Sequence, residues 1–191
     1  MKAVDFVLNN HLEKKAGKYN YGEIKAVKII DEKEMNRARS IIDKNFSFTK
    51  ETKDKHLKIF VLSQDDNFNR KILEHKKLDA LVLADSKMKR SLRHENSGLN
   101  HVICKIATSK KKPIIINLSD IFSQKGKEQA ETLEKLRQNI KLCRKAKTKI
   151  FVASFAKTEK QLRDSYDVFA LCISLGMDTQ TAKFALEKIG V

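Results

Sequence analysis

"NSGLNHVICKIATSKKKPIIINLSDIF", residues 96–122, joins a predicted helix to a predicted strand. The helix, over 97–110, carries an apolar stripe at the spacing i, i+3, i+4 and i+7, formed by Leu99, Val102, Ile103 and Ile106. Pro113 then opens the run 113–119, whose nearly continuous Ile and Leu side chains are typical of a parallel strand buried on both faces. A helix followed by such a strand is the repeating unit of an α/β protein.

The same alternation continues on both sides of this stretch. Apolar, β-branched runs predict strands at 3–8, 24–30, 57–62, 79–84, 113–119 and 149–155. Amphipathic segments between them predict helices at 33–45, 66–76, 97–110, 126–147, 164–175 and 179–189. Six strands leave both an open sheet and a reduced barrel possible, because a full eight-stranded barrel takes about 250 residues. No repeat or linker interrupts the pattern, so we predict one domain over residues 1–191.

The charge of the chain is strongly unbalanced. It has 191 residues with 40 Lys and Arg against 24 Asp and Glu, a net charge of +16, and an isoelectric point of about 9.7. A folded protein tolerates such an excess most easily when a polyanion neutralises it, and nucleic acid is the commonest polyanion. An anionic membrane surface is a weaker alternative. Lysine enrichment from an AT-rich genome or a hot habitat would explain the charge without any partner.

The remaining composition indicates a protein of a reducing compartment. Cys104, Cys143 and Cys172 lie far apart, each within an apolar helical pattern, so we expect them to be buried as small apolar side chains. The first residues, "MKAVDFVLNN", become polar too soon for a signal peptide, and no apolar run approaches about 18 residues. We therefore expect a cytoplasmic location and no membrane partner.

The segment 85–96 is a candidate anion site. It follows a strand and precedes the helix 97–110, so it lies at the carboxyl edge of the sheet, where α/β proteins bind ligands. Arg90 and Arg93 bring positive charge to the start of that helix, where free backbone N–H groups favour an anion. Asn96 or Ser97 is the expected N-cap. A solvated basic loop with a merely structural cap is an equally good explanation.

A catalytic role for this segment is disfavoured. Ser97 and His101 could form a nucleophile pair, but a serine that caps its helix is not free to attack. No GxSxG turn or Cys/His arrangement accompanies them. The five histidines also lack the paired spacing of a metal hydrolase on this type of scaffold. We therefore expect no catalytic residue and no metal ligand in this chain.

A second concentration of positive charge lies on the predicted helix 126–147. Residues 137–149 contain six Lys and Arg and no acidic residue. With the buried stripe at Leu133, Leu136, Ile140 and Cys143, a separate face of the helix carries Arg137, Lys141 and Arg144, or Lys145 in its place. Solvated faces normally mix both signs of charge, so a ridge of one sign favours contact with phosphates. Aromatic residues are few, which favours recognition of the backbone and shape of folded RNA over base stacking.

Four motifs in this order resemble the ribonuclease P protein component 3 family: "NSGLNHVICKIA" (96–107), "KPIIINLSDIF" (112–122), "LRQNIKLCRKAKTKIFVASFA" (136–156) and "LRDSYDVFALCISLGM" (162–177). The resemblance spans about 80–188 and is compatible with Asp5 in the first strand. It implies a reduced, irregular TIM-barrel-like α/β fold. Two positions depart from the family pattern: Ser165 stands where a proline is frequent, and Phe155 where Gly or Ser is frequent.

The resemblance also implies a non-catalytic role. In this family the RNA subunit, with magnesium, removes the 5′ leader of precursor tRNA, so no cofactor is expected in this chain. The implied partners are ribonuclease P RNA, precursor tRNA, other ribonuclease P proteins and protein component 2, with which the family commonly forms a heterotetramer. Residues matching the family's motifs are Asn96, Ser97, Gly98, Leu99, Asn100, His101, Ser119, Arg137, Asn139, Ser154, Arg163 and Asp167.

The predicted function is therefore a non-catalytic RNA-binding subunit of ribonuclease P. The alternatives are a metal-dependent phosphoesterase of the barrel type and a basic scaffold that binds only proteins. Arg163 and Asp167, four residues apart, could instead form a structural ion pair. The predicted RNA-binding or partner-binding residues are Arg90, Arg93, Asn96, Ser97, Gly98, Asn100, His101, Lys105, Ser119, Arg137, Lys141, Arg144, Ser154, Arg163 and Asp167.

Overall fold

Strands and helices alternate along the chain in a computed structural model, which describes residues 3–8, 10–26, 29–30, 60–76, 78–83 and 98–187. The described strands are β1 (Val4–Val7), β2 (Glu23–Ala26), β3 (Ile29–Ile30), β4 (Phe60–Leu62), β5 (Ala80–Leu83), β6 (Ile114–Asn117) and β7 (Ile150–Ala153). The described helices are α2 (Asp66–Glu74), α3 (His101–Ser109), α4 (Leu118–Ser123), α5 (Gly126–Ala146), α6 (Ser165–Ser174) and α7 (Thr179–Glu187). The described residues also form the short 3₁₀ turns η1 (Asn10–Lys15), η2 (Gly17–Tyr19) and η4 (Glu159–Gln161).

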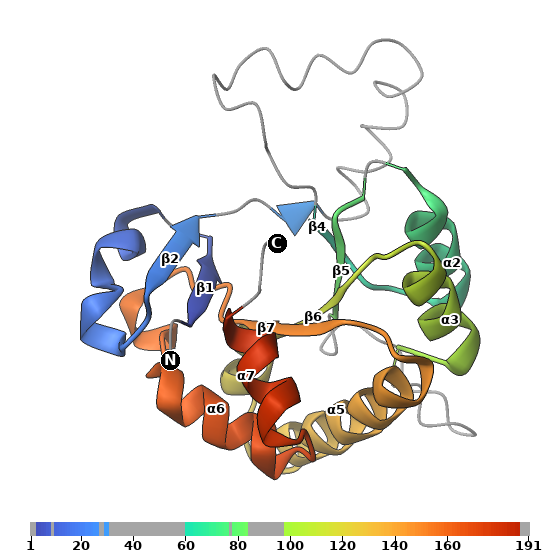
Figure 1. The fold of residues 1–191 in the computed structure, drawn as a ribbon. Helices are drawn as coiled ribbons and strands as arrows, with labels where there is room; N and C mark the ends of the chain where they lie inside the picture. Colours follow the sequence, from blue (N-terminus) through green and yellow to red (C-terminus); the bar gives the residue numbers. More distant parts are fainter. Residues whose placement is uncertain are drawn as a thin grey trace, which may run out of the picture.

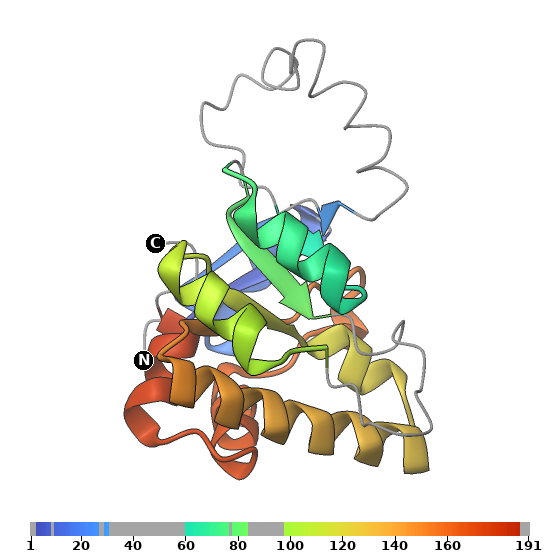
Figure 2. The ribbon, with the colours of Figure 1, turned by 90° about the vertical axis from the view of Figure 1, so that its right-hand side faces the viewer.

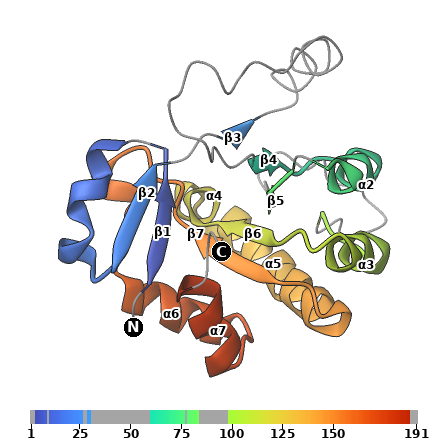
Figure 3. The same ribbon diagram turned by 45° about the horizontal axis from the view of Figure 1, so that its top comes forward.

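All described strand pairs are parallel. One sheet has the order β3-β4-β5-β6-β7, and β1 pairs with β2 in a second sheet. The two sheets meet where β1 runs beside the end of β7: Phe155 donates its backbone N–H to the Phe6 carbonyl over 2.7 Å, and Val7 forms a bridge with Ala156. β2, in one sheet, is followed in the chain by β3, the first strand of the other sheet. Figure 3 shows the strands of both sheets arranged around a common centre.

Helices cover the outer side of this curved arrangement. Figure 1 shows α2, α3, α5, α6 and α7 around the strands, and Figure 2 shows α2, α3 and α5 following one another along one side. Helices outside and parallel strands inside are the architecture of a TIM barrel, here with fewer and shorter strands. The predicted TIM-barrel-like α/β fold is confirmed. None of the helices in this described part is long and apolar enough to cross a bilayer.

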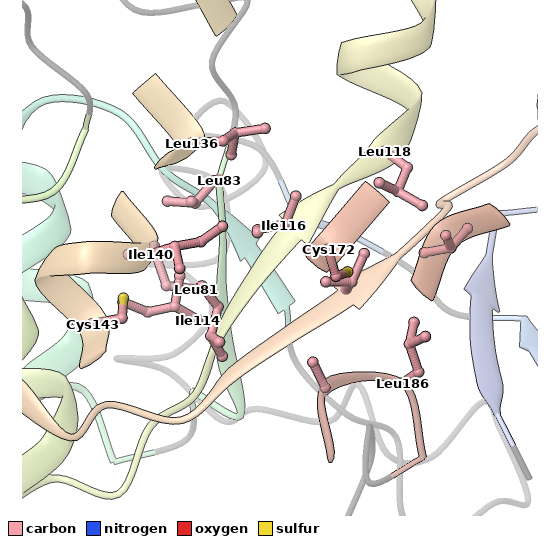
Figure 4. Packing of buried hydrophobic residues seen from close by; sticks show 14 of the residues in the cluster. Leu81, Leu83, Ile114, Ile116, Leu118, Leu136, Ile140, Cys143, Cys172 and Leu186 are labelled. Carbon is pink, nitrogen blue, oxygen red and sulfur yellow. The ribbon is translucent and has the colours of Figure 1, made fainter. Parts of the chain in front are cut away.

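The alternation of side chains along the strands gives the protein two apolar clusters. One faces the common centre and contains Phe6, Phe60, Ala80, Val82, Ile115, Phe151, Ala153 and Phe155. The other lies between the strands and the helices, with Leu81, Ile114 and Ile116 packed near Leu136 and Ile140 of α5 (Figure 4). Burial of each large apolar side chain stabilises the fold by about 1.5–3 kcal/mol. This double burial explains why the strands have nearly continuous apolar sequences.

Most predicted elements are confirmed, with two corrections to the strands. The predicted strand 24–30 is divided into β2 and β3, which belong to different sheets. The strand predicted at 113–119 ends at Asn117, because the Asn117 side chain accepts the Ser119 backbone N–H over 3.0 Å and starts α4, a helix the sequence did not predict. The helix predicted at 33–45 lies outside the described residues. Cys104, Cys143 and Cys172 are free and buried, as predicted.

Candidate nucleic-acid interface

The start of α3 is held by Asn100. Its Oδ1 accepts the backbone N–H groups of Val102 and Ile103, each over 2.9 Å, which satisfies two donors that the first helical turn leaves without partners. The prediction that Asn96 or Ser97 caps this helix, and that the helix begins at 97, is therefore wrong. Asn100 is a better cap because its backbone is extended and the helix begins immediately after it, at His101.

Helix α2 fixes the approach to α3, a role that the sequence analysis did not predict. Asn100 donates through Nδ2 to Oδ2 of Asp66 over 2.8 Å, and Asn69, which is fully buried, donates to the Gly98 carbonyl over 3.2 Å. Asp65 accepts the Phe68 N–H over 2.8 Å and caps α2. The sequence signal was available, because two aspartates directly before an amphipathic segment are a typical helix start.

The site residues predicted around this helix start divide into two groups. Arg90, Arg93, Asn96 and Ser97 lie outside the described residues. His101 and Lys105 are exposed on α3, on the side opposite its buried residues Ile103, Cys104 and Ala107. Buried Gly98, with φ of 79°, adopts a left-handed conformation that favours glycine. Residues 98–101 therefore form a fixed turn that leaves His101 accessible to a partner.

Helix α5 presents its predicted cations to solvent. Arg137, Lys141 and Arg144 are exposed, whereas Leu136, Asn139, Ile140 and Cys143 are buried. The Arg137 guanidinium also donates to the Ser174 carbonyl at the end of α6 over 3.0 Å and lies 3.9 Å from Glu134. Arg137 thus joins α5 to α6, while a role for it in RNA binding stays a prediction.

Arg163 contacts an aromatic ring. Its guanidinium carbon lies 4.5 Å from the centre of the Phe122 ring, and Nη1 donates to the carbonyls of Lys160 and Leu162, each over 2.8 Å. No ion pair joins Arg163 to Asp167, although the structure describes both residues, so the structural pair suggested by their spacing is not formed. Asp167 is exposed in the first turn of α6. Arg163 therefore packs the segment before α6 against α4.

Ser119 and Ser154, predicted from separate motifs, meet at the carboxyl edge of the sheet. Ser119 donates through Oγ to the Ser154 carbonyl over 2.6 Å. Ser154 is 1% exposed; its N–H donates to Oδ1 of Asp5 over 2.7 Å, and its Oγ accepts the Ala156 N–H over 3.2 Å. These bonds connect α4, β7 and β1. Ser154 is buried and holds the junction of the two sheets, while a role for it in RNA or partner binding stays a prediction.

Asp5 is a buried carboxyl group at this junction. It is 1% exposed, and burial raises its pKa to about 6, against the opposing effect of its hydrogen bonds with Ser154. Its second oxygen, Oδ2, is buried without a hydrogen-bond partner. Within the described ranges, no three His, Cys, Asp or Glu side chains lie close enough together to hold a metal ion.

A further group of cations lies at the amino edge of the sheet; the sequence placed Lys147 and Lys149 in the basic stretch 137–149 but did not bring them together with Lys110 and Lys111. The Thr108 hydroxyl in the last turn of α3 and the Thr148 hydroxyl lie 2.8 Å apart, and this contact brings together the segments that follow α3 and α5. These two segments carry the exposed residues Lys110, Lys111, Lys147 and Lys149. Lys111 and Lys147 each end a helix in the left-handed conformation, with φ of 55° and 56°. Their clustering depends on the pairing of β6 with β7, which sequence spacing does not reveal.

Solved structures and curated proteins show similarity to this chain. A chain of a cryo-EM structure of archaeal ribonuclease P with mature tRNA matches 95% of this chain and 76% of its own length, with a TM-score of 0.67 and 20% identity. Ribonuclease P protein component 3 of Methanococcus vannielii is 28% identical over 68% of this chain and 53% of its own length. The corresponding protein of Methanocaldococcus jannaschii is 29% identical over 44% of this chain and 36% of its own length.

These similarities concern part of each curated relative. The chain spans about half the length of the Methanococcus vannielii protein, and a smaller share of the Methanocaldococcus jannaschii protein. The sequence model of the family described as RNase P subunit p30 matches residues 30–189, which is most of this chain. The motifs over 96–177 that resemble ribonuclease P protein component 3 lie within the matched region. The chain belongs to the ribonuclease P subunit p30 family.

Proposed function

We propose that this chain is a non-catalytic RNA-binding protein subunit of ribonuclease P, which supports a catalytic RNA in removing the 5′ leader of precursor tRNA. The observation that carries the proposal is the excess of 16 positive charges on a chain of the p30 family, with exposed Lys141, Arg144 and Lys145 in the last turns of α5. Family membership favours this function over that of a barrel-type phosphoesterase. The similar solved chain comes from an archaeal ribonuclease P that holds mature tRNA.

The mechanism that these residues support is electrostatic. Lys and Arg side chains neutralise phosphates and release condensed counterions, so that the folded form of the RNA is reached at a lower magnesium concentration. In this proposal the chain needs no cofactor, and magnesium acts on the RNA. Its partners are ribonuclease P RNA, precursor tRNA and protein component 2, the last in a heterotetramer. The junction around Asp5 and Ser154 maintains the fold and takes no part in the chemistry.

Reconstitution tests the function directly. An archaeal ribonuclease P RNA and protein component 2 are assayed for cleavage of precursor tRNA at limiting magnesium, with and without this chain. We expect the chain to increase the cleavage rate at limiting magnesium and to have little effect when magnesium is abundant. Equal rates with and without the chain at every magnesium concentration would contradict the proposal.

Salt dependence tests the placement of the contacts. For Z neutralised phosphates, the logarithm of the binding constant falls with the logarithm of salt concentration at a slope of about −0.7Z to −0.9Z. Each of Arg90→Ala and Lys141→Ala should weaken binding to the RNA and flatten that slope by about one unit. If both variants bind as the unchanged protein does at low salt, the predicted RNA-binding face is wrong.

A further inference from the structure

A hollow of 450 Å³ lies at the amino edge of the sheet, between the end of α5, the start of β7 and the turn from α6 to α7. We call it the amino-edge hollow. Arg144, Lys147 and Lys149 lie along it, together with Ile150, Met177 and Phe184. Figure 2 shows these elements on the same side of the molecule, with the long helix α5 beside the red helices α6 and α7. The volume is within the range of about 300–1,000 Å³ for small-ligand sites.

The electrostatics of the hollow favour an anion. Its three basic residues are exposed, and Asp178 is the single acidic residue among those that line it. The Asp178 carboxylate is already engaged: it accepts the Thr181 backbone N–H over 2.8 Å and the Thr181 hydroxyl over 2.7 Å. These bonds lower the pKa of Asp178 and keep its charge at the start of α7. The hollow is therefore lined by three positively charged side chains and one carboxylate, and that carboxylate is already hydrogen-bonded.

An accessible aromatic ring completes the hollow. Phe184 of α7 is 38% exposed, although it is a large apolar side chain. Its inner face stacks on Phe151, with ring centres 5.6 Å apart and an angle of 22° between the planes. Lys149 Nζ lies 6.0 Å from the centre of the Phe184 ring. Phe184 thus rests on a second ring, has a lysine ammonium over it and keeps 38% of its surface exposed; part-exposed aromatic rings beside cations are surfaces on which unstacked nucleobases pack.

Lys147 has an unusual backbone conformation at the edge of the hollow. Its φ is 56°, and its backbone N–H and that of Thr148 donate to the Arg144 and Cys143 carbonyls, which is the usual ending of a helix. Glycine is the residue that this position accepts without strain. The lysine at this position adds a positive charge between Arg144 and Lys149, and its left-handed backbone conformation destabilises the fold relative to glycine.

We propose that the amino-edge hollow binds an unstacked nucleotide of RNA, with the base against Phe184 and its flanking phosphates near Arg144, Lys147 and Lys149. The inference rests on the proposed RNA-binding function and assigns it a further contact, at the amino edge of the sheet. A hydrophobic face alone would fit a protein partner equally well. The three cations and the single engaged carboxylate favour a phosphodiester.

The first experiment separates position from charge. The triple variant Arg144→Ala, Lys147→Ala, Lys149→Ala is titrated with an archaeal ribonuclease P RNA transcript by filter binding over a range of salt concentrations. A matched triple variant, Lys14→Ala, Lys71→Ala, Lys127→Ala, removes the same charge from exposed sites on η1, α2 and the start of α5. The hollow variant should flatten the salt slope by about two units, as expected for three single-strand phosphates, and the matched variant should flatten it much less.

The second experiment reports on base stacking. The chain contains no tryptophan, so Phe184→Trp supplies a single indole at the hollow. Addition of the RNA should quench its fluorescence with the same dissociation constant as filter binding gives, because a stacked base quenches the indole. Tyr166→Trp, on the exposed side of α6, should show no such saturable change. Phe184→Ala should reduce affinity about tenfold with an unchanged salt slope, and Phe184→Trp should retain it. Urea denaturation of each variant checks that the fold is intact.

Different results would contradict the proposed RNA-binding function and the assignment of the hollow as an RNA site. If the unchanged chain does not bind the RNA, the proposed function fails. If it binds, and the two triple variants behave alike and the indole at 184 is not quenched, only the hollow is excluded as an RNA site. If the hollow variant keeps its RNA affinity but loses association with protein component 2, the hollow is a protein-docking site and the inference is overturned.

Discussion

Ser154 donates its backbone N–H to Oδ1 of Asp5 over 2.7 Å, although the two residues are 149 positions apart in the chain. The bond connects the first strand to the end of the last and lies in a region from which water is excluded. A charged carboxylate in such a place needs compensation, which the N–H and hydroxyl groups of Ser154 and the backbone N–H of Phe6 supply only in part. Burial therefore raises the pKa of Asp5 to about 6. The junction of the two sheets is therefore sensitive to pH.

Asp5→Asn tests this sensitivity. A carboxyl group whose pKa is raised on folding favours the folded state when protonated, so its contribution is lost as pH rises from about 4 through about 6. Relative to Asp5→Asn, the unchanged protein should lose roughly 2 kcal/mol of unfolding free energy between pH 4 and pH 7. Urea denaturation across this range measures the difference. Asp167→Asn, on the exposed side of α6, is the control, and the prediction fails if both variants follow the pH profile of the unchanged protein.

Asn100→Ala should destabilise the protein by about 1–2 kcal/mol. The change removes the acceptor for the Val102 and Ile103 N–H groups and the donor to Asp66. Asn100→Ser should recover part of the loss, because a serine hydroxyl also caps a helix. His101→Ala, one position later and exposed, should change stability by less than about 0.5 kcal/mol. Equal effects of Asn100→Ala and His101→Ala in chemical denaturation would contradict the role of Asn100 as the cap.

Phe155 combines burial with a left-handed backbone. Its φ is 47° and its side chain, 1% exposed, belongs to the central apolar cluster. Phe155→Ala should cost about 3–5 kcal/mol, and Phe155→Gly should cost about 1 kcal/mol less, because glycine relieves the backbone strain. At Phe151, within a strand, the order should be reversed, with Ala more stable than Gly. The same order at both positions in chemical denaturation would show that Phe155 is not strained.

Lys147→Gly and Lys111→Gly should each stabilise the protein by about 0.5–1 kcal/mol, because both lysines end helices in the left-handed conformation that glycine prefers. Lys141→Gly, in the middle of α5, should instead destabilise it by about 1 kcal/mol. Thermal and urea denaturation measure these changes. Lys147→Gly should also weaken RNA binding, so that stability and affinity change in opposite directions. A loss of stability in both left-handed variants would refute the argument.

The fold could be predicted from the sequence because the strands have a recognisable pattern of apolar residues. The runs 114–116 and 150–153 are apolar on both faces, which is typical of a parallel sheet covered on both sides. The start of α3 was harder to predict. Asn96, Ser97 and Asn100 are all acceptable caps by residue type, and the choice among them depends on the contact between Asn100 and Asp66, which belongs to another helix.

Only part of the candidate site could be predicted, because contacts between separate elements are not visible in the sequence. Helical periodicity was enough to predict that Lys141 and Arg144 are exposed. It could not show that Arg163 packs on Phe122 and not beside Asp167, because Phe122 belongs to a helix that was not predicted. The amino-edge cations depend on the register between β6 and β7, with Ile114 opposite Ile150, which brings two separate lysine segments together.

The junction between β1 and the end of β7 also has a consequence for biosynthesis. The first strand emerges from the ribosome long before residues 154–156, to which it is joined by hydrogen bonds. Contacts this distant in sequence form slowly, because a long loop must close before they are made. Phe6 and Val7 therefore lack these partners until residues 154–156 have emerged, and until then they present apolar surface that a chaperone can bind. Closure of the sheet around its centre is accordingly a late event in folding, and the nascent amino-terminal segment is the part that needs protection from aggregation.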